Sequence, residues 1–429
     1  NLASFRQQGG SFLIAICIGS MAEAECKAKP SGIDVARGLS QEFLTEEFFE
    51  KHWEKLPLHY RAREKGKSAN RLPEALSVDD VMSMLRKAGP SLKMFKKGDP
   101  SDHESFMVAY LDGVSLIVNQ ADRTTEVLMD LCRALGKAHF LHAFCVAYLT
   151  PPGSQAVRLH TDDQDVFLLQ VWGKKEWTIR NAPKPLCYTE EMLGKDTPVP
   201  KELVGDPIME FTMEPHDILY IPRGYLHEAA TGTEPSLHIT VTMPTSDYCW
   251  GVQLVKHCMQ HLSLNKSEPS LLRRPLSSKA PSAGDDLDKQ LKDIVGSWAS
   301  DVKMGSVLEA FEQRMAQTNE GQERQFARMS EIKSPPRVTE DSKVRLMHGI
   351  TCLCHPRKEL ALFVKPDNQQ MEVPAAKTAM PMLKALTHRP QLVTDLPCED
   401  AFERVCVLQL LHQQRVVQLF AGSGSLAGG

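Results

Sequence analysis

The chain has 429 residues, of which 42% are hydrophobic and 24% charged, and 50 Lys and Arg against 54 Asp and Glu give a net charge of −4. This length predicts two or three units with enough apolar residues for a sizeable core. The near balance of charge, without a long basic run, speaks against a protein that binds DNA directly. Eleven scattered cysteines favour reduced thiols in a cytosolic or nuclear setting.

The first part of the chain, residues 1–39, is expected to be a disordered N-terminal extension. Residues 11–18 are apolar, but this run is far too short to cross a bilayer. Only Arg6 precedes it as a cation, and position 1 is not Met. We therefore expect residues 1–20 to be a fragment end or a non-native extension, and we infer no secretion.

The sequence His160-Thr161-Asp162, followed much later by His227, is the main chemical motif. On an extended strand, residues i and i+2 point to the same side, so His160 and Asp162 can reach one metal ion. A third ligand is then expected from another strand. Two imidazoles and one carboxylate leave half of an octahedral Fe(II) open, as a non-haem oxygenase requires. The alternative is a chance triplet and an ordinary core or surface histidine.

Strand patterns follow this triplet. Residues 166–172 form an apolar run rich in β-branched and aromatic side chains, residues 173–175 suit a turn, and residues 176–179 start a second strand. The sequence therefore predicts a β-hairpin that carries the first two ligands.

Further strands surround the second histidine. Residues 215–217 suit a turn, residues 218–222 suit a buried strand, and residues 237–242 alternate with period two. His227 is therefore expected in a loop between strands. Short antiparallel strands with inward-pointing ligands indicate a mainly β fold with some helix, a double-stranded β-helix of the jelly-roll or cupin type.

Five segments together resemble one family, the JmjC-type ribosomal oxygenases of the cupin-4 group. The similar segments are residues 48–58, which precede the barrel in that family, and residues 147–155, 160–170, 222–229 and 236–240. They occur in the family's order, which makes the resemblance specific. It implies a JmjC/cupin catalytic domain over residues 40–255.

The resemblance also implies a set of site residues. It assigns Fe(II) binding and catalysis to His160, Asp162 and His227. The co-substrates would be O2 and 2-oxoglutarate, and the far carboxylate of 2-oxoglutarate needs a cation and hydroxyl donors.

The family's positions for these co-substrate contacts fall on Tyr148, Lys175 and Thr242. Thr242 departs from the eukaryotic pattern, which has serine there, but it keeps the hydroxyl. Without the resemblance, Tyr148 would be a core aromatic residue and Lys175 a solvated turn lysine.

Other polar residues near the motif have weaker assignments. His238 is expected to form hydrogen bonds beside the metal ligands, or else to be a core histidine. Asp163 and Asp165 are expected to face solvent or the substrate rim. Glu228 has no firm role.

Beyond the barrel, residues 263–288 have the composition of a linker, and helical periodicity returns over residues 287–311. The resemblance implies that residues 256–330 pair two subunits in a homodimer; the alternative is that these helices pack on their own barrel.

The last unit, residues 331–420, would suit the family's winged-helix domain. It holds 12 Lys and Arg against 10 Asp and Glu, which favours protein contacts over sequence-specific nucleic-acid binding. Residues 421–429 are expected to be a disordered tail.

The function that the resemblance implies is hydroxylation of a side chain, first of all histidine, in a ribosomal protein. One alternative is demethylation of lysine in a histone tail by the same iron site, which would make the protein a chromatin regulator. Another is a non-catalytic, metal-binding cupin. The expected location is the nucleus or nucleolus, with the cytoplasm as the alternative, and no membrane partner is expected.

Overall fold

The structure is a computed structural model. It describes residues 29–66, 68–195, 197–243, 245–264, 289, 292–293, 295–297, 299–300, 302–331, 337–354, 360–366, 369–374 and 379–420.

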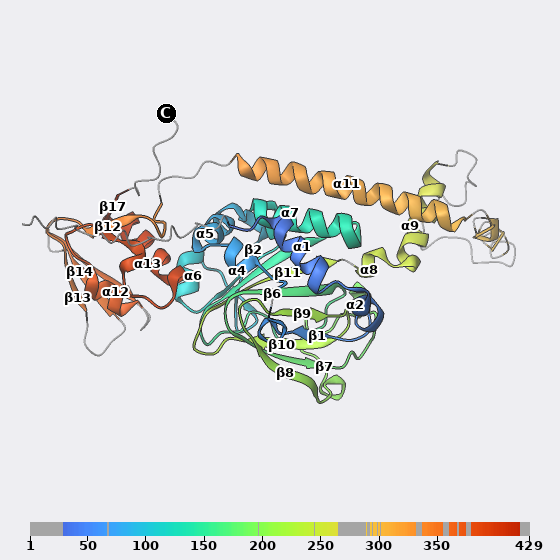
Figure 1. The fold of residues 1–429 in the computed structure, drawn as a ribbon, viewed down its shortest axis with the longest axis horizontal. Coiled ribbons are helices and arrows are strands. Elements are labelled where there is room, and N and C mark those ends of the chain that lie inside the picture. Colours follow the sequence, from blue (N-terminus) through green and yellow to red (C-terminus); the bar gives the residue numbers. More distant parts are fainter. Residues whose placement is uncertain are drawn as a thin grey trace, which may run out of the picture.

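Two antiparallel sheets form the barrel at the centre of the molecule (Figure 1). The large sheet consists of β1 (Leu58–Tyr60), β2 (Leu92–Lys96), β3 (Asp99–Pro100), β4 (Ser115–Val118), β5 (Phe144–Thr150), β6 (Asp165–Gly173), β9 (Ile218–Ile221) and β11 (Ser236–Met243). Its strand order is β1-β9-β6-β11-β5-β4-β2-β3. The small sheet has the order β10-β7-β8, formed by β7 (Lys175–Arg180), β8 (Pro207–Met213) and β10 (Leu226–Ala230). This arrangement confirms the predicted jelly roll.

Strand β6 of the large sheet is buried on both faces. In β6, Phe167, Leu169 and Val171 pack into the main core, while Val166 and Leu168 belong to a second core with residues of the small sheet. Successive side chains of a strand point to opposite faces, so one continuous apolar run can supply both cores.

Strand β11 follows the same alternation with a polar inner face. Leu237, Ile239, Val241 and Met243 join the main core. His238, Thr240 and Thr242, in between, are buried too. Their side chains must therefore lie on the other face of the strand, towards the small sheet.

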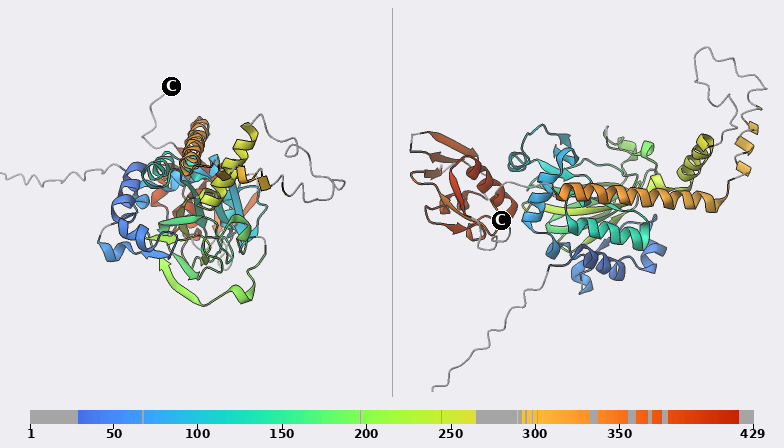
Figure 2. Two further views of the ribbon diagram at one scale, coloured as in Figure 1. Left: turned by 90° about the vertical axis from the view of Figure 1, so that its right-hand side faces the viewer. Right: turned by 90° about the horizontal axis from the view of Figure 1, so that it is seen from above.

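Helices cover the outer face of the large sheet (Figures 1 and 2). Those that precede the ligand triplet are α1 (Gly32–Glu42), α2 (Glu46–Lys51), α3 (Ala62–Lys65), α4 (Leu72–Ala75), α5 (Val78–Lys87), α6 (Phe106–Leu111) and α7 (Glu126–Leu135).

Helix α1 corrects the predicted N-terminal boundary. It begins at Gly32, inside the expected extension 1–39, and packs against α7. A capping box between Ser31 and Asp34 starts it, and Val35 and Leu39 are buried in the core. The folded unit therefore begins before residue 40, and residues 1–28 lie outside the described part.

The predicted hairpin at residues 173–175 is wrong. Strands β6 and β7 belong to different sheets, so the chain crosses from one sheet to the other at Gly173, where φ is +62°. His227 is also not in a loop, because it lies in β10.

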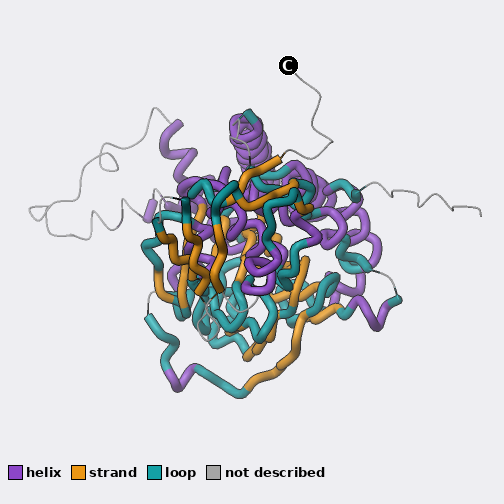
Figure 3. The backbone as a smooth tube through the Cα atoms, turned by 90° about the vertical axis from the view of Figure 1, so that its left-hand side faces the viewer, coloured by secondary structure: helices purple, strands orange, loops and turns teal. Residues whose placement is uncertain are grey.

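After the barrel, the described part of the chain includes α8 (Thr245–Tyr248), α9 (Trp250–Leu264) and the long α11 (Met304–Ser330). The α11 helix lies along α7, and Figure 3 shows it end-on above the rest. Its Gln322 donates to Asp122 over 2.7 Å, and Asn319 contacts His142 over 2.6 Å. This helix thus packs on its own barrel, while pairing of two subunits stays a prediction. No described helix has the length and apolar composition to cross a membrane.

The last unit lies beside the barrel, against α5 and α6 (Figure 2). It contains two three-stranded sheets, β16-β12-β17 and β13-β14-β15. Its elements are β12 (Lys343–Leu346), β13 (Thr351–Cys354), β14 (Leu360–Val364), β15 (Gln370–Pro374), α12 (Met380–Ala385), β16 (Gln391–Leu392), α13 (Ala401–Gln413) and β17 (Val417–Phe420). The winged-helix assignment stays a prediction. The expected tail 421–429 and most of the linker 263–288 lie outside the described residues.

Candidate functional site

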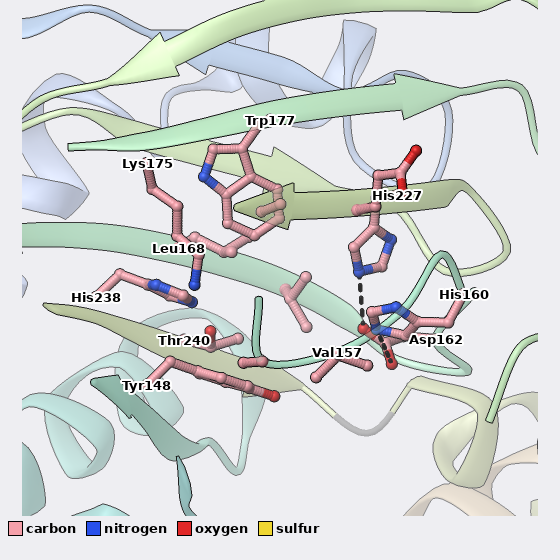
Figure 4. Close-up of a pocket in the computed structure, with 14 residues that line it drawn as sticks. Tyr148, Val157, His160, Asp162, Leu168, Lys175, Trp177, His227, His238 and Thr240 are labelled. Atoms are coloured by element: carbon pink, nitrogen blue, oxygen red, sulfur yellow. Dashed lines mark ion pairs between the residues drawn. The ribbon is translucent and has the colours of Figure 1, made fainter. Parts of the chain in front are cut away.

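The structure brings the three predicted metal ligands together (Figure 4). The backbones of His160 and His227 form a β-bridge, with N–H···O distances of 3.1 and 2.9 Å. Nε2 of His160 lies 3.7 Å from Oδ1 of Asp162, and Nε2 of His227 lies 3.5 Å from Oδ2. One ligand atom from each residue lies within 4.8 Å of the others. Thr161 points away, and its hydroxyl accepts from the Leu193 amide.

Hydrogen bonds orient both imidazoles for metal binding. Nδ1 of His160 lies 2.7 Å from the Arg158 carbonyl oxygen, and Nδ1 of His227 lies 3.0 Å from that of Tyr225. A carbonyl can only accept, so each Nδ1 carries the proton and each Nε2 keeps its lone pair. A metal-bound histidine needs this arrangement.

Electrostatics favour the same protonation states. Burial, followed by the neighbouring His227 and Lys195, lowers the pKa of His160 well below its ordinary value. Burial alone would raise the pKa of Asp162, but the Lys195 ammonium and, after it, the two imidazoles hold it well below the usual range. A neutral imidazole and an ionised carboxylate are the forms that bind a divalent cation.

A cavity extends from these ligands into the barrel (Figure 4). At its inner end lie Tyr148, Lys175, Trp177, His238 and Thr240. Three of their buried polar atoms have no hydrogen-bond partner among the described residues: Trp177 Nε1, His238 Nδ1 and Thr240 Oγ1. Native proteins rarely leave so many buried polar atoms unpaired in one place, so this end suits a polar ligand.

Lys175 gives the inner end its cation. Its side chain is only 2% exposed, and Nζ donates to the Thr150 hydroxyl over 3.1 Å. Burial lowers its pKa to about 7. The expectation of a solvated turn lysine, which came from the local sequence alone, is wrong, and the position fits a carboxylate site.

Two aromatic rings frame this cation. Nζ of Lys175 lies 5.9 Å from the centre of the Tyr148 ring and 5.8 Å from that of Trp177. The Tyr148 ring stacks on His238 with centres 4.8 Å apart. Burial, then the Asp162 carboxylate, raises the pKa of Tyr148, so its hydroxyl stays a donor.

Beside the predicted Thr242, the structure offers a second candidate, Thr240. Thr242 is buried on β11, but Thr240 is the threonine that lines the cavity. The two residues share one face of the strand, two positions apart, so alternation allows either. How far along the strand the cavity extends decides which of the two threonines lines it. The alternation of one strand in the sequence does not reveal this position.

The acidic neighbours differ in their surroundings. Asp165 does not face solvent, because it is fully buried and accepts from the hydroxyls of Tyr220 and Thr245. Burial raises its pKa to about 6. Asp163 is half-buried and accepts hydrogen bonds from the hydroxyls of Thr189 and Ser246. Glu228 lines the cavity and forms an ion pair with Arg180 over 3.0 Å.

The donor set and the unpaired atoms fit Fe(II) and a dicarboxylate. Two Nε2 atoms and a carboxylate form the facial set typical of non-haem iron. The lysine and the hydroxyls lie deeper in the same cavity, where they can bind a far carboxylate. Trp177, Thr240 and Lys195 are site residues that the sequence did not indicate. For Thr240, the alternation of β11 was the available signal.

Comparison with known proteins supports this interpretation. Residues 117–249 match the model of the JmjC domain. The chain is 26% identical over 415 residues to the bifunctional lysine-specific demethylase and histidyl-hydroxylase NO66 of Aedes aegypti, covering 83% of this chain and 64% of that protein. It is 32% identical over 212 residues to the protein of the same name in Dictyostelium discoideum, covering 46% and 40%. With ribosomal oxygenase 2 of Rattus norvegicus it shares 37% identity over 112 residues, covering 25% and 22%.

One solved structure that the chain matches is the ribosomal oxygenase YcfD of Escherichia coli in complex with cobalt and 2-oxoglutarate. It is 18% identical, with a TM-score of 0.42, and the match covers 87% of this chain and 98% of that chain. By contrast, the chain spans less than two thirds of the length of the NO66 and ribosomal oxygenase 2 proteins named above. Residues 117–249 thus match the JmjC domain, and the chain is similar to the NO66 and ribosomal oxygenase 2 proteins.

Proposed function

We propose that this protein is an Fe(II)- and 2-oxoglutarate-dependent oxygenase that hydroxylates a histidine side chain of a ribosomal protein. The observation that carries the proposal is the pair of oriented Nε2 atoms beside Asp162, at the mouth of a cavity whose inner end holds Lys175. When bound, Fe(II) with 2-oxoglutarate and O2 supplies an oxidant for an unactivated C–H bond and releases succinate and CO2.

The residues of the chain bind the iron and the co-substrate, orient the ligands and exclude water from the site. His160, Asp162 and His227 hold the iron, and the Nδ1 hydrogen bonds keep both imidazoles in the metal-binding tautomer. Lys175, with the Thr240 and Tyr148 hydroxyls, fixes the far carboxylate of the co-substrate. The buried walls of the cavity exclude water from the charged groups, which strengthens each of these contacts.

The names of the relatives support the substrate. Histidyl-hydroxylase and ribosomal oxygenase occur in the names of the NO66 and ribosomal oxygenase 2 proteins. Lysine-specific demethylase occurs in the first of these names, so demethylation of a lysine in a histone tail is the second candidate. A nuclear or nucleolar location, a role in chromatin and a homodimer formed through the helical region belong to the proposal as well.

The experiment is a mass-spectrometric assay with the full chain. Ribosomes are incubated with the protein, Fe(II), ascorbate and 2-oxoglutarate, and ribosomal peptides are searched for the gain of one oxygen on histidine. The His160→Ala variant removes a ligand. His103→Ala is the matched control, because His103 pairs with Asp112 outside the cavity.

The expected result is oxidation by the wild type and by His103→Ala, and none by His160→Ala. A parallel incubation with methylated histone peptides tests the second candidate: loss of methyl groups from these peptides, without oxidation of ribosomal peptides, would support the demethylase instead. Absence of 2-oxoglutarate turnover with both substrates contradicts the oxygenase and favours a metal-binding cupin without catalytic activity.

A further inference from the structure

A segment outside the barrel's regular strands holds the ligand triplet from one side. It comprises residues 184–195, between β7 and β8, and is called the strap below. Its Leu193 amide donates to the Thr161 hydroxyl over 2.9 Å, and its Leu193 carbonyl oxygen accepts from the Thr161 amide over 3.0 Å. The strap is therefore bonded to the residue between the first two ligands.

The next residue of the strap lies directly against a metal ligand. Gly194 has a φ of +79°, and a Cβ atom there would collide with the Leu159 carbonyl oxygen and with Cα of His160. Only glycine fits a backbone that approaches so closely in this conformation. This approach places the next residue, Lys195, at the carboxylate of Asp162.

The backbone of Asp162 is fixed as well. Its carbonyl oxygen accepts from the Gly224 amide over 2.8 Å and from the Cys187 thiol of the strap over 3.3 Å. Its side chain meets Lys195, whose Nζ lies 2.6 Å from Oδ1. The Lys195 side chain is 36% exposed and that of Asp162 25% exposed, so the pair lies at the rim rather than in the core.

We propose that Lys195 is a positioning residue that engages Oδ1 of Asp162 and so leaves a single oxygen of this carboxylate for the metal. The inference rests on the metal site of the proposed function. A carboxylate can bind a metal ion with one oxygen or with two. A charge-assisted hydrogen bond to an ammonium competes with the second mode, because it occupies one oxygen.

The number of oxygens that Asp162 offers to the metal matters for the reaction. If Asp162 gave the metal one oxygen and each histidine gave one nitrogen, the three side chains would supply three ligand atoms. The remaining coordination positions would be left for 2-oxoglutarate and O2. If Asp162 bound through both oxygens, it would take one of the positions that the co-substrates need.

The test counts water ligands rather than turnover. The full chain is loaded with Mn(II), and the relaxation rate of the water protons is measured, which rises with the number of exchangeable waters on the ion. In Lys195→Met, Oδ1 is free to replace one of three waters, so we expect the relaxation enhancement to fall by about a third. Affinity for Mn(II) should not weaken, because a cation beside the ion is removed.

Two further variants isolate the cause. Lys195→Arg keeps a cationic donor and should restore the wild-type relaxation. Lys184→Met is the matched control, because Lys184 belongs to the same strap but pairs with Glu191 instead. It should behave as the wild type, and circular dichroism should show the same fold for all variants.

The outcomes separate the inference from the metal site. If His160→Ala binds Mn(II) as well as the wild type does, the metal site itself is wrong. If the wild type binds Mn(II) through His160 but Lys195→Met keeps the full relaxation enhancement, the metal site stands and the role of Lys195 is refuted. An equal decrease in Lys184→Met also refutes that role, because it points to a general loosening of the strap.

Discussion

At the scale of single residues, the unpaired polar atoms at the inner end of the cavity are the clearest sign of a ligand. A buried donor or acceptor without a partner costs about 1–3 kcal/mol. Trp177, His238 and Thr240 each contribute one such atom to the same cavity. A ligand with several oxygens can form hydrogen bonds with all three atoms. Its binding then removes the free-energy cost of their burial, and this gain adds to the affinity for the ligand.

Thr240 and Thr242 form a matched pair that tests this site. Thr240→Val removes a hydroxyl that lines the cavity, so we expect the affinity for 2-oxoglutarate to fall roughly fivefold, the equivalent of about 1 kcal/mol. Thr242→Val makes the same change outside the cavity lining and should leave the affinity within twofold. Isothermal titration with Mn(II)-loaded protein measures both. Equal losses in the two variants would contradict the assignment of Thr240.

Lys175 predicts a pH dependence of co-substrate binding. Burial lowers its pKa to about 7, and only the protonated form attracts a carboxylate. The protonated fraction decreases as the pH rises above that value. We therefore expect the affinity for 2-oxoglutarate to fall about tenfold per pH unit above roughly pH 7, until the higher pKa of the complex is reached.

This dependence is measured by titration between pH 6 and pH 9. Lys175→Met should bind weakly at every pH. Lys174→Met is the control, because Lys174 is the exposed neighbour and contacts Glu214 and Glu234 at the surface. An affinity that is constant across this range in the wild type contradicts the lowered pKa of Lys175, and wild-type affinity in Lys175→Met excludes Lys175 as the carboxylate's cation.

Five of the six site residues that the sequence predicted lie together at one cavity: His160, Asp162, His227, Tyr148 and Lys175. Their roles in binding metal and co-substrate stay predictions. The i, i+2 spacing of His160 and Asp162 is a local property, so the sequence reveals it. The contact between Lys195 and Asp162 joins residues 33 positions apart, and Lys195 lies in an irregular segment. No periodic pattern in the sequence indicates such a contact.

At the scale of elements, the connection between β6 and β7 shows where local patterns are insufficient. Two apolar segments with a glycine and two lysines between them fit a hairpin. The partners of each strand, however, are distant in the chain: β6 pairs with β9 and β11, and β7 with β8 and β10. The strands themselves were predicted correctly, and the pairing is set by burial of both faces of β6.

Gly173 should be essential for this crossing. Its φ is +62°, and a Cβ atom there would collide with the carbonyl oxygen of Pro235. We expect Gly173→Ala to lower the free energy of unfolding by roughly 2–4 kcal/mol, through backbone strain and displacement of the start of β11. Gly205→Ala is the control, since a Cβ atom there meets nothing within 4 Å. Urea unfolding of both variants gives the comparison, and a loss under 1 kcal/mol for Gly173→Ala contradicts the prediction.

At the scale of the whole molecule, one of the contacts that join the last unit to the barrel unit is buried and polar. Asp400 caps α13 by accepting the amides of Phe402 and Glu403 through Oδ1. Its Oδ2 accepts from the hydroxyl of Tyr110 in α6 over 2.6 Å. The Tyr110 and Phe402 rings meet edge to face, with centres 4.8 Å apart. One carboxylate thus both starts a helix of one unit and binds the other unit.

Tyr110→Phe should weaken this attachment without affecting the metal site. The variant keeps the ring contact but leaves a buried carboxylate oxygen without its hydroxyl donor, which costs about 1–3 kcal/mol. Burial already raises the pKa of Asp400, so the carboxylate has little water to replace the lost bond. We expect amide exchange in α6 and in the first turn of α13 to accelerate by roughly 5- to 150-fold, while Mn(II) binding at His160 stays unchanged. Tyr225→Phe is the control, because its hydroxyl donates to the Lys55 carbonyl at an exposed position. If exchange in α6 and α13 matches the wild type, the two units are held by the surrounding apolar contacts, and the Asp400 bond serves the helix cap alone.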